Sequence, residues 1–129
     1  MKYLLTLWGD ESRMADLTPE QREEGMKAWD AYTTDAKETG KFLGGEGLQP
    51  TSTATTVQIA ESGDPTVTDG PFAETKEQLG GFYLLDCENL DEALEWARKI
   101  PMPGGKVEVR PVMDYEGSEV HSQEAEARR

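Results

Sequence analysis

The sequence predicts a mixed α+β domain in which two helices cover one face of an antiparallel sheet. Two apolar runs, at residues 2–8 and 81–87, have the length and composition of β-strands. Two other segments begin with helix caps and carry apolar residues at helical spacing. With the remaining extended segments they give a β-α-β-hairpin-β-α-β order, and right-handed crossovers place both helices on the same side of the sheet.

The first strand and the first helix have clear local signals. Residues 2–8, KYLLTLW, are apolar on both faces, and a polar loop is expected after them. A helix is expected at residues 19–39, because Thr18 and Gln21 match a capping box and Gly40 suits a left-handed C-terminal cap. Its buried stripe is predicted to comprise Gly25, Met26, Trp29, Tyr32 and Ala36.

The second half of the chain completes the sheet and adds the second helix. Extended segments are expected at residues 41–50 (glycine-rich), 53–69 (a β-hairpin), 81–87 (the central strand) and 106–112 (the last strand). Between the last two strands, Asn89 can cap a helix that Pro101 stops.

These elements form a ferredoxin-like α+β domain with an inserted hairpin at residues 1–113, followed by a polar tail at 114–129. The tail has no apolar stripe and is expected to add little stability. One face of the sheet has no helix over it, although strands 2–8 and 81–87 are apolar on both sides. We therefore expect a homodimer packed sheet to sheet.

Composition excludes several classes of function. The formal net charge of −13 repels phosphate backbones and anionic lipid, so nucleic-acid and membrane-surface roles are not expected. No apolar run approaches the roughly 20 residues of a membrane span, and the N-terminus does not match a signal peptide. A cytoplasmic protein is expected.

The scarcity of cysteine and histidine limits the possible chemistry. Cys87 is the one cysteine, so no intrachain disulfide forms, and it is best interpreted as a small buried side chain. The one histidine, His121, lies in the polar tail. A zinc site and a Ser/His/Asp set inside the domain are therefore excluded. The spacing of Asp69, Glu74 and Glu77 is only a weak signal for a divalent ion bound by carboxylates, so neither a metal nor a cofactor is expected.

Residues 68–86, TDGPFAETKEQLGGFYLLD, place a charged run between a tight turn and the central strand. In the turn, Asp69 can hydrogen-bond to backbone groups and Gly70 supplies backbone freedom, while Phe72 can anchor the corner in the core. Asp69 is thus either a turn residue or a contact to a ligand.

The charged run itself offers three candidate site residues, Glu74, Lys76 and Glu77. Such a run is usually a solvated face. If it lines a cleft, Lys76 can hold an anionic or carbonyl group, and Asp69 with either glutamate can accept protons or hydrogen bonds. The pair Gly80-Gly81 then removes side chains where the backbone approaches a ligand or a partner strand.

Two further candidates for ligand binding lie outside this stretch. Glu46 is flanked by glycines in GGEG and is either a ligand contact or a turn residue. Arg110 shares one face of the last strand with Lys106 and Glu108, and that face is either exposed to solvent or lines a cleft.

Three stretches together carry a resemblance to a known family: GEGLQP at 45–50, DGPFAETKEQLGGFYLLD at 69–86 and LDEALEWARKIP at 90–101. With the order of elements, they resemble the DGPF group of the YCII-related (YciI-like) family over residues 1–112. The resemblance implies a dimeric ferredoxin-like α/β barrel but no settled reaction. Relatives that use a His–Asp acid–base pair are not matched, because the domain holds no histidine.

The leading hypothesis is a small cytoplasmic homodimer that binds a small organic molecule in a polar cleft beside the DGPF turn, with or without catalysis. The alternative is a regulatory or interaction protein. The family resemblance connects that alternative with sigma factors of the extracytoplasmic-function type. Convergence of the candidate side chains in a concave pocket would favour the first hypothesis, and their exposure on a convex surface would favour the second.

Overall fold

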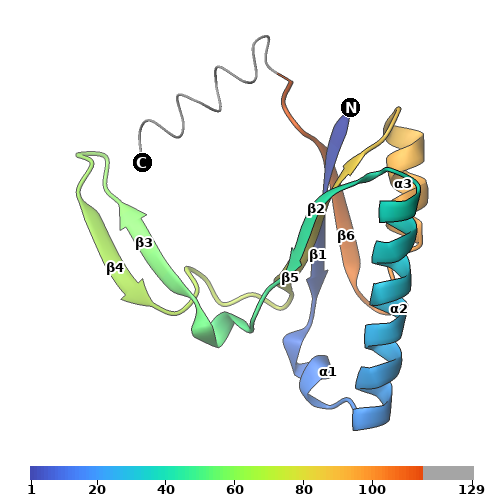
Figure 1. Ribbon diagram of the computed structural model, residues 1–129. Coiled ribbons are helices and arrows are strands. Elements are labelled where there is room, and N and C mark those ends of the chain that lie inside the picture. Colours follow the sequence, from blue (N-terminus) through green and yellow to red (C-terminus); the bar gives the residue numbers. More distant parts are fainter. Residues whose placement is uncertain (115–129) are drawn as a thin grey trace.

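The computed structural model describes residues 1–114 and shows a mixed α+β fold (Figure 1). Its elements in chain order are β1 (Lys2–Gly9), α1 (Glu11–Ala15), α2 (Pro19–Glu38), β2 (Phe42–Gly47), the 3-10 turn η1 (Thr51–Thr53), β3 (Thr55–Ile59), β4 (Pro65–Asp69), β5 (Gln78–Asp86), α3 (Leu90–Arg98) and β6 (Lys106–Pro111). This order confirms the predicted succession of strands, helices and hairpin. It is compatible with a ferredoxin-like arrangement.

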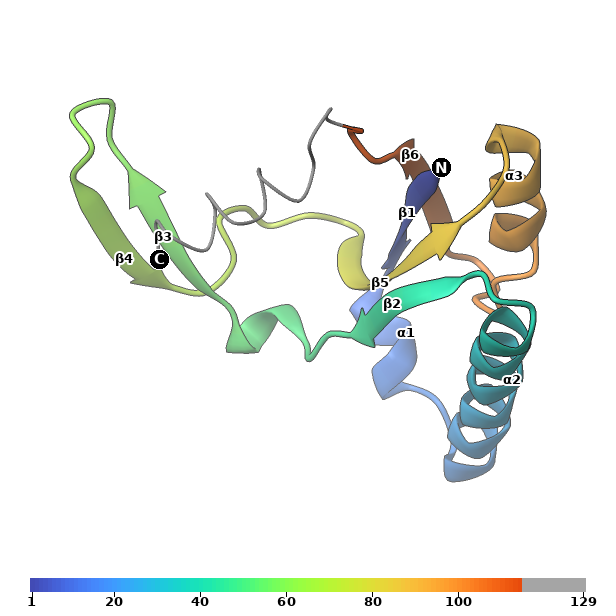
Figure 2. The same cartoon turned by 45° about the horizontal axis from the view of Figure 1, so that its top comes forward.

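The main sheet has the strand order β2-β5-β1-β6, and neighbouring strands are antiparallel. Helices α2 and α3 lie on the same side of this sheet (Figures 1 and 2). The strand at 78–86 is central, as the sequence predicts, because β1 pairs on one side of it and β2 on the other. The short helix α1 follows β1 at one end of the sheet.

The alternation of β1 decides which side chains enter the core. Tyr3, Leu5 and Leu7 are buried beneath the helices, while the residues between them are only half-buried. Helix α2 starts with the predicted capping box, in which Thr18 accepts from the Gln21 backbone N–H and the Gln21 side chain accepts in return. The period-2 pattern thus determines which face of β1 is buried, and the capping box determines where the covering helix α2 begins.

Tyr83 of β5 lies at the centre of the aromatic core. Its ring stacks on Trp29 with centroids 6.2 Å apart and meets Tyr32 edge-on at 5.0 Å. Its hydroxyl shares a 2.6 Å hydrogen bond with Thr33, so the buried phenol is satisfied. The Tyr32 hydroxyl donates to the carbonyl of Trp96 at 2.9 Å, which joins α2 to α3. Burial raises the pKa of Tyr32 far above its ordinary value.

Glycines at 45 and 81 permit β2 and β5 to approach closely. A Cβ on Gly81 would lie 2.7 Å from the carbonyl oxygen of Glu46, and one on Gly45 would lie 2.9 Å from that of Phe82. Because these neighbours are backbone atoms, the strands would have to separate to admit a side chain. The Gly-Gly pair and the glycines around Glu46 are thus explained in part by strand pairing.

The face of the sheet opposite the helices, here the open face, is lined by Leu4, Thr6, Trp8, Phe82, Leu84, Lys106, Glu108 and Arg110. Its centre is apolar, since Leu4 pairs with Leu84 across β1 and β5. Its border on β6 is charged. Within residues 1–114 no helix covers this face, and its apolar side chains stay half-buried.

The hairpin β3–β4, here the arm (residues 55–69), forms a separate two-stranded sheet. It projects from the domain on the side of the open face (Figures 1 and 2). All residues of β4 are exposed, and Thr56 is the one residue of β3 that is not. The arm thus contributes nothing to the core of its own domain.

Four sequence expectations need correction or lie outside the structure. Met26 does not join the α2 stripe but is exposed, because it falls on the solvent side of the helix. Phe72 does not anchor its turn in the core and is 88% exposed. Residues 11–15 form α1 rather than a loop, because the Asp10 side chain caps them. The tail beyond residue 114, with His121, lies outside the described residues.

The core position of Leu85 gives a first prediction. Leu85 is fully buried, so Leu85→Ala is expected to lower the free energy of unfolding by about 3 kcal/mol through lost burial and a cavity. Leu43→Ala is the control, because Leu43 is 46% exposed and is expected to lose under about 1 kcal/mol. Urea unfolding at one fixed protein concentration measures both, and equal losses would contradict this placement of the core.

Candidate functional site

A cleft of about 460 Å³ opens at the end of the sheet where β1, β5 and β6 meet. It is lined by Trp8, Glu77, Lys106, Val107 and Glu108. Trp8, Lys106 and Glu108 come from the open face, where Trp8 pairs with Lys106 across β1 and β6. Glu77 comes from the charged run that precedes β5. An aromatic wall with a few charged groups is the usual composition of a small-molecule site.

The charges of the cleft are arranged by one short ion pair. The Lys106 ammonium donates to Glu77 Oε1 at 2.6 Å, although the Lys106 side chain is 73% exposed and that of Glu77 only 28%. The pair joins the start of β5 to the start of β6 across the sheet end. The ammonium is held at a defined point while it stays accessible to a ligand.

The indole ring of Trp8 is also fixed in position. Its Nε1–H donates to the Thr6 hydroxyl at 2.9 Å, and that hydroxyl donates in turn to the Glu108 carbonyl at 3.4 Å. Since the polar edge of the ring is satisfied within the sheet, its remaining surface is available for apolar or stacking contact.

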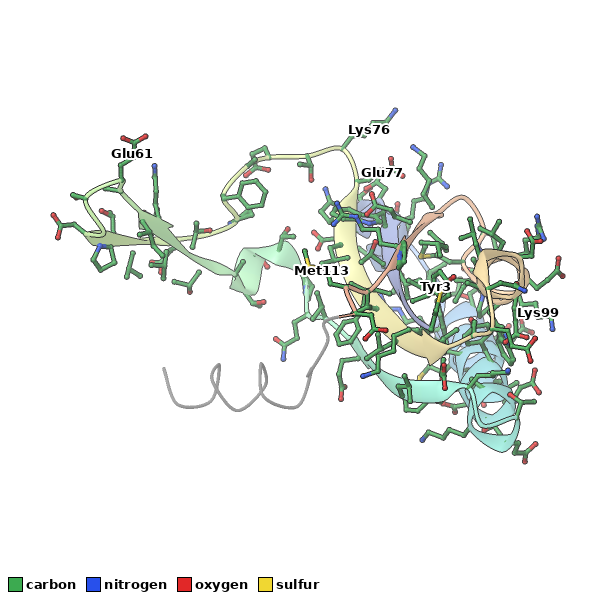
Figure 3. All side chains as sticks on the ribbon, turned by 90° about the horizontal axis from the view of Figure 1, so that it is seen from above. Tyr3, Glu61, Lys76, Glu77, Lys99 and Met113 are labelled. Atoms are coloured by element: carbon green, nitrogen blue, oxygen red, sulfur yellow. The ribbon has the colours of Figure 1, made fainter. Side chains whose placement is uncertain are left out.

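Of the residues expected from the DGPF stretch, the structure brings Glu77 alone into the cleft. Asp69 is exposed at the end of β4, and Glu74 and Lys76 are exposed on the connection from the arm to β5. None of the three forms an ion pair among the described residues. Figure 3 shows the Lys76 side chain pointing outward, with Glu77 beside it nearer the strands. In this chain, therefore, Asp69, Glu74 and Lys76 do not converge on one point.

The two other candidates, Glu46 and Arg110, lie on the main sheet but apart from each other. Glu46 pairs with Phe82 across β2 and β5 and is exposed at the outer strand. Arg110 forms a 3.4 Å ion pair with Glu108 along the opposite outer strand. Arg110 thus reaches the cleft indirectly, through Glu108, and Glu46 does not line it.

The first residues of α1 hold both connections of the arm, which sequence reasoning did not anticipate. The Glu11 carboxylate accepts from the Thr51 backbone N–H and from the Thr51 hydroxyl, each at 2.8 Å. The Glu11 backbone N–H donates to the Gln78 side chain at 2.9 Å, and the Gln78 amide donates to the Thr75 carbonyl at 2.6 Å. Glu11 thus ties the chain entering the arm to the chain leaving it.

Asp10, the cap of α1, has a lowered pKa. The main cause is the hydrogen bond from the Ser12 hydroxyl, followed by that from the Ser12 backbone N–H; the positive charges of Arg13 and Lys76 add to it. Lys76 therefore has its electrostatic effect on the α1 end of the molecule. Folding favours the charged form of Asp10. Its contribution to the stability of the fold is therefore present above the ordinary pKa of an aspartate and is lost as the pH falls through the lowered pKa.

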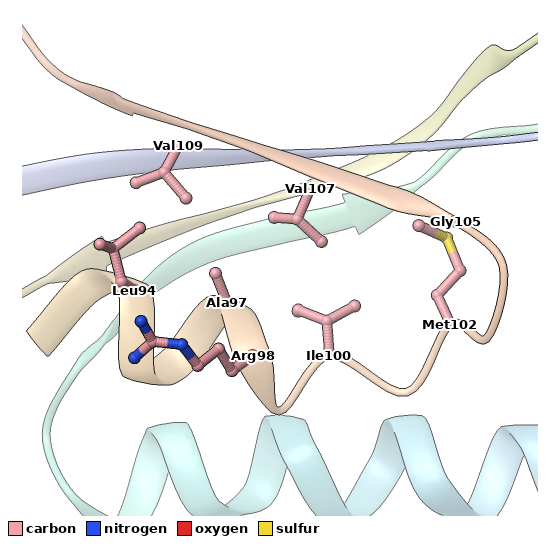
Figure 4. A pocket seen from close by; sticks show the side chains of 8 residues that line it. All are labelled: Leu94, Ala97, Arg98, Ile100, Met102, Gly105, Val107 and Val109. Carbon is pink, nitrogen blue, oxygen red and sulfur yellow. The ribbon is translucent and has the colours of Figure 1, made fainter. Parts of the chain in front are cut away.

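A second cavity, of about 350 Å³, lies between α3 and β6 (Figure 4). Its walls are apolar and include Ile100, Met102 and Val107. Arg98, the charged residue at its edge, is paired with Glu95 on the same helix. With one charged side chain at its edge, this cavity offers fewer groups to orient a ligand than the cleft beside Trp8, which is lined by Glu77, Lys106 and Glu108.

Among residues 1–114, no group of three or more histidine, cysteine, aspartate or glutamate side chains is placed to hold a metal ion. Cys87 is buried, as the sequence predicts, and burial raises its thiol pKa. No helix in the same range is long and apolar enough to cross a membrane.

Comparison with known proteins agrees with the sequence resemblance. A family model described as a YCII-related domain matches residues 1–116. The chain belongs to the YCII-related family. It is also 41% identical over 125 residues to an uncharacterized protein of Rhizobium meliloti (strain 1021), and the match covers 95% of this chain and 100% of that relative. The predicted family is confirmed, and neither match brings an assigned reaction with it.

Sequence reasoning missed the cleft because its residues are distant in the chain. The sequence places Trp8 in a strand that is apolar on both faces and Lys106 on a charged face, but their pairing depends on the β1–β6 register. The available signal was the period-2 pattern of residues 106–110, which puts all three charges on one side.

The Glu11 contacts give a second prediction. Glu11→Ala removes both acceptors of Thr51, so residues 48–54 are expected to exchange their amide hydrogens at least about 10-fold faster, corresponding to about 1.4 kcal/mol of easier local opening. Glu20→Ala in the first turn of α2 is the matched control and should leave this segment unchanged. Hydrogen exchange read by mass spectrometry measures both, and unaltered exchange in the Glu11 variant would contradict the clamp.

Proposed function

We propose that this YCII-related protein is a cytoplasmic homodimer of the dimeric α/β-barrel type that binds a small polar organic molecule in the cleft lined by Trp8, Glu77 and Lys106. The observation that carries the proposal is the accessible Lys106 ammonium held at 2.6 Å from Glu77 beside an exposed part of an indole ring. Lys106 binds an anionic or carbonyl group of the ligand, and Trp8 contacts its apolar or planar part.

The acidic side chains give the cleft a second kind of contact. Glu77 and Glu108 are acceptors for hydroxyl or amino groups of the ligand, so a molecule with donors beside its carbonyl or carboxylate fits best. An acid–base step at this site rests on these carboxylates and on Lys106, because the domain contains no histidine. Binding is the function proposed; a reaction is not part of it.

The homodimer is supported by the open face. Leu4, Phe82 and Leu84 form an apolar centre on the face of the sheet that no helix covers within residues 1–114. Contiguous apolar surface of this kind is normally covered in a stable protein, and a two-fold related copy presents the same surface. Two such sheets facing each other make the barrel that the family resemblance implies.

Ligand binding is tested with two lysine variants. A thermal-shift screen of a metabolite library identifies a ligand, which at 100 times its dissociation constant adds about 2.7 kcal/mol to stability. Lys106→Ala is then expected to weaken binding at least 10-fold in calorimetric titration, because it removes the cation of the cleft. Lys76→Ala is the matched control, because Lys76 is next to Glu77 in the chain but its side chain points outward (Figure 3).

The same two variants show which lysine binds the ligand. If Lys76→Ala weakens binding 10-fold and Lys106→Ala does not, the ligand lies on the DGPF connection and the cleft proposal is wrong. If neither variant changes the affinity, both lysines are excluded as the cation of the site.

Dimerisation is tested on the open face. Light scattering at micromolar concentration is expected to give twice the 14.3 kDa mass of the chain. Leu84→Asp places a charge in the apolar centre and is expected to give a species of single mass or to unfold the protein. Leu90→Asp, at an exposed leucine in the first turn of α3, is the control and should stay dimeric. A wild-type chain of single mass would refute the homodimer.

A further inference from the structure

We propose that the arm docks on a second copy of this chain, along the β6 border of that copy's open face, so that two copies exchange arms. The proposal rests on the homodimer of the preceding subsection and adds to it an interaction surface outside the sheet. It also names the surface that receives the arm.

The first observation is the exposure of the arm's apolar side. Val57 pairs directly with Val67 across the hairpin, and these side chains are 52% and 67% exposed. Ile59 follows on the same face and is 70% exposed. An isolated two-stranded hairpin is at best marginally stable in water, so this one needs a surface that its own domain does not supply.

The second observation is that the arm is fixed at its base. The Gly70 backbone N–H donates to the Ala54 carbonyl at 2.7 Å, and the Thr56 hydroxyl donates to the Gly70 carbonyl at 2.8 Å. Gly70 has a φ of +96°, a conformation in which other residues would be strained. These bonds close the base of the hairpin, and the Glu11 contacts tie the segment that enters it to α1.

The third observation is a division of charge. The sequence has no lysine or arginine between Lys41 and Lys76, whereas the arm carries Glu61, Asp64 and Asp69. The β6 border of the open face carries two exposed cations, Lys106 and Arg110, each of which is already paired with one glutamate of its own chain. Carboxylates of the acidic arm can approach these cations from their exposed side, next to the apolar centre of the face, whereas anionic lipid or nucleic acid would repel the arm.

Two-fold symmetry brings these surfaces together. The arm is inserted between β2 and β5, and β2 is the outer strand on the side opposite β6. When two sheets face each other about an axis parallel to their strands, the β2 side of one copy lies over the β6 side of the other. An arm that leaves the β2 side toward the partner thus reaches the partner's Lys106 and Arg110 border.

The area of contact also favours an arm. Four strands at about 4.8 Å spacing, with about six residues each at about 3.3 Å, give the open face a footprint of roughly 400 Å², half of the ~800 Å² per partner of a stable interface. The two arm strands add roughly 160 Å². Phe72, which follows the arm in the chain and is 88% exposed, adds on the order of 150 Å². The arm and Phe72 together bring the interface closer to the usual size.

The test compares the two faces of the arm. Val57→Asp/Val67→Asp places two charges on the apolar face, and Gln58→Asp/Thr66→Asp places the same two charges at the adjacent cross-strand pair on the polar face. Sedimentation equilibrium of the full chain is expected to show a dimer dissociation constant raised at least 10-fold for the first variant and less than 3-fold for the second. The wild-type chain is measured alongside.

A second readout follows the arm directly. In the wild-type chain, amides of residues 55–69 are expected to be protected from hydrogen exchange above the dimer dissociation constant and to lose that protection on dilution below it. Protection that is independent of concentration would mean that the arm is covered within one chain and would overturn the proposal.

The remaining outcomes separate this proposal from the proposed function. A wild-type dimer that both variants leave intact, or weaken equally, refutes arm exchange while the sheet-to-sheet dimer stands. A monomeric wild-type chain refutes arm exchange and the dimer together. Ligand binding in the cleft is judged by a separate measurement, the Lys106→Ala titration.

Discussion

The close approach of β2 to β5 is the constraint on which the rest of this structure depends. It requires Gly81 opposite the Glu46 carbonyl and Gly45 opposite the Phe82 carbonyl, because a Cβ at either position would meet backbone atoms under 3 Å away. The β2–β5 pairing ends at Gly47 and Gly81, and the arm and its connections leave the sheet beyond this pair. The first residues of β5 continue beside β1, where Gln78 pairs with Gly9, and this brings Glu77, one residue before β5, to the edge of the cleft.

Most of the fold was predictable because its signals are local. The capping box at Thr18, the cap at Asn89 and the alternation of residues 2–8 each act within a few positions, and the structure confirms them. Helix α1 was missed because five residues carry too little periodicity to separate from a polar loop. Phe72 was misplaced because turn chemistry determines the course of the backbone and says nothing about which way an adjacent aromatic side chain points.

The candidate site was less predictable than the fold because its residues come together only through the pairing register of neighbouring strands. Glu77 was selected from its position beside a fixed turn, and the structure places it in the cleft with Lys106. The Trp8–Lys106 pairing that completes the cleft depends on how β1 and β6 align, which no single segment encodes. Asp69, Glu74 and Lys76 are close to Glu77 in the sequence, but Asp69 ends β4 and the other two are exposed on the connection that follows. Closeness in sequence therefore did not place them in the cleft with Glu77.

The DGPF turn and the cleft thus lie at opposite ends of one connection. No contact within residues 1–114 of a single chain accounts for the exposure of Phe72 in this turn. Gly70 and Thr56 build a defined corner that leaves Phe72 in solvent. A fixed corner carrying an exposed aromatic side chain resembles the anchors at the centre of protein interfaces more than it resembles a catalytic loop. Because the charged run starts at this corner and ends at Glu77, arm docking by a second copy would order the connection that delivers Glu77 to Lys106. Assembly and ligand binding would then be coupled through eight residues of chain, from Gly70 to Glu77.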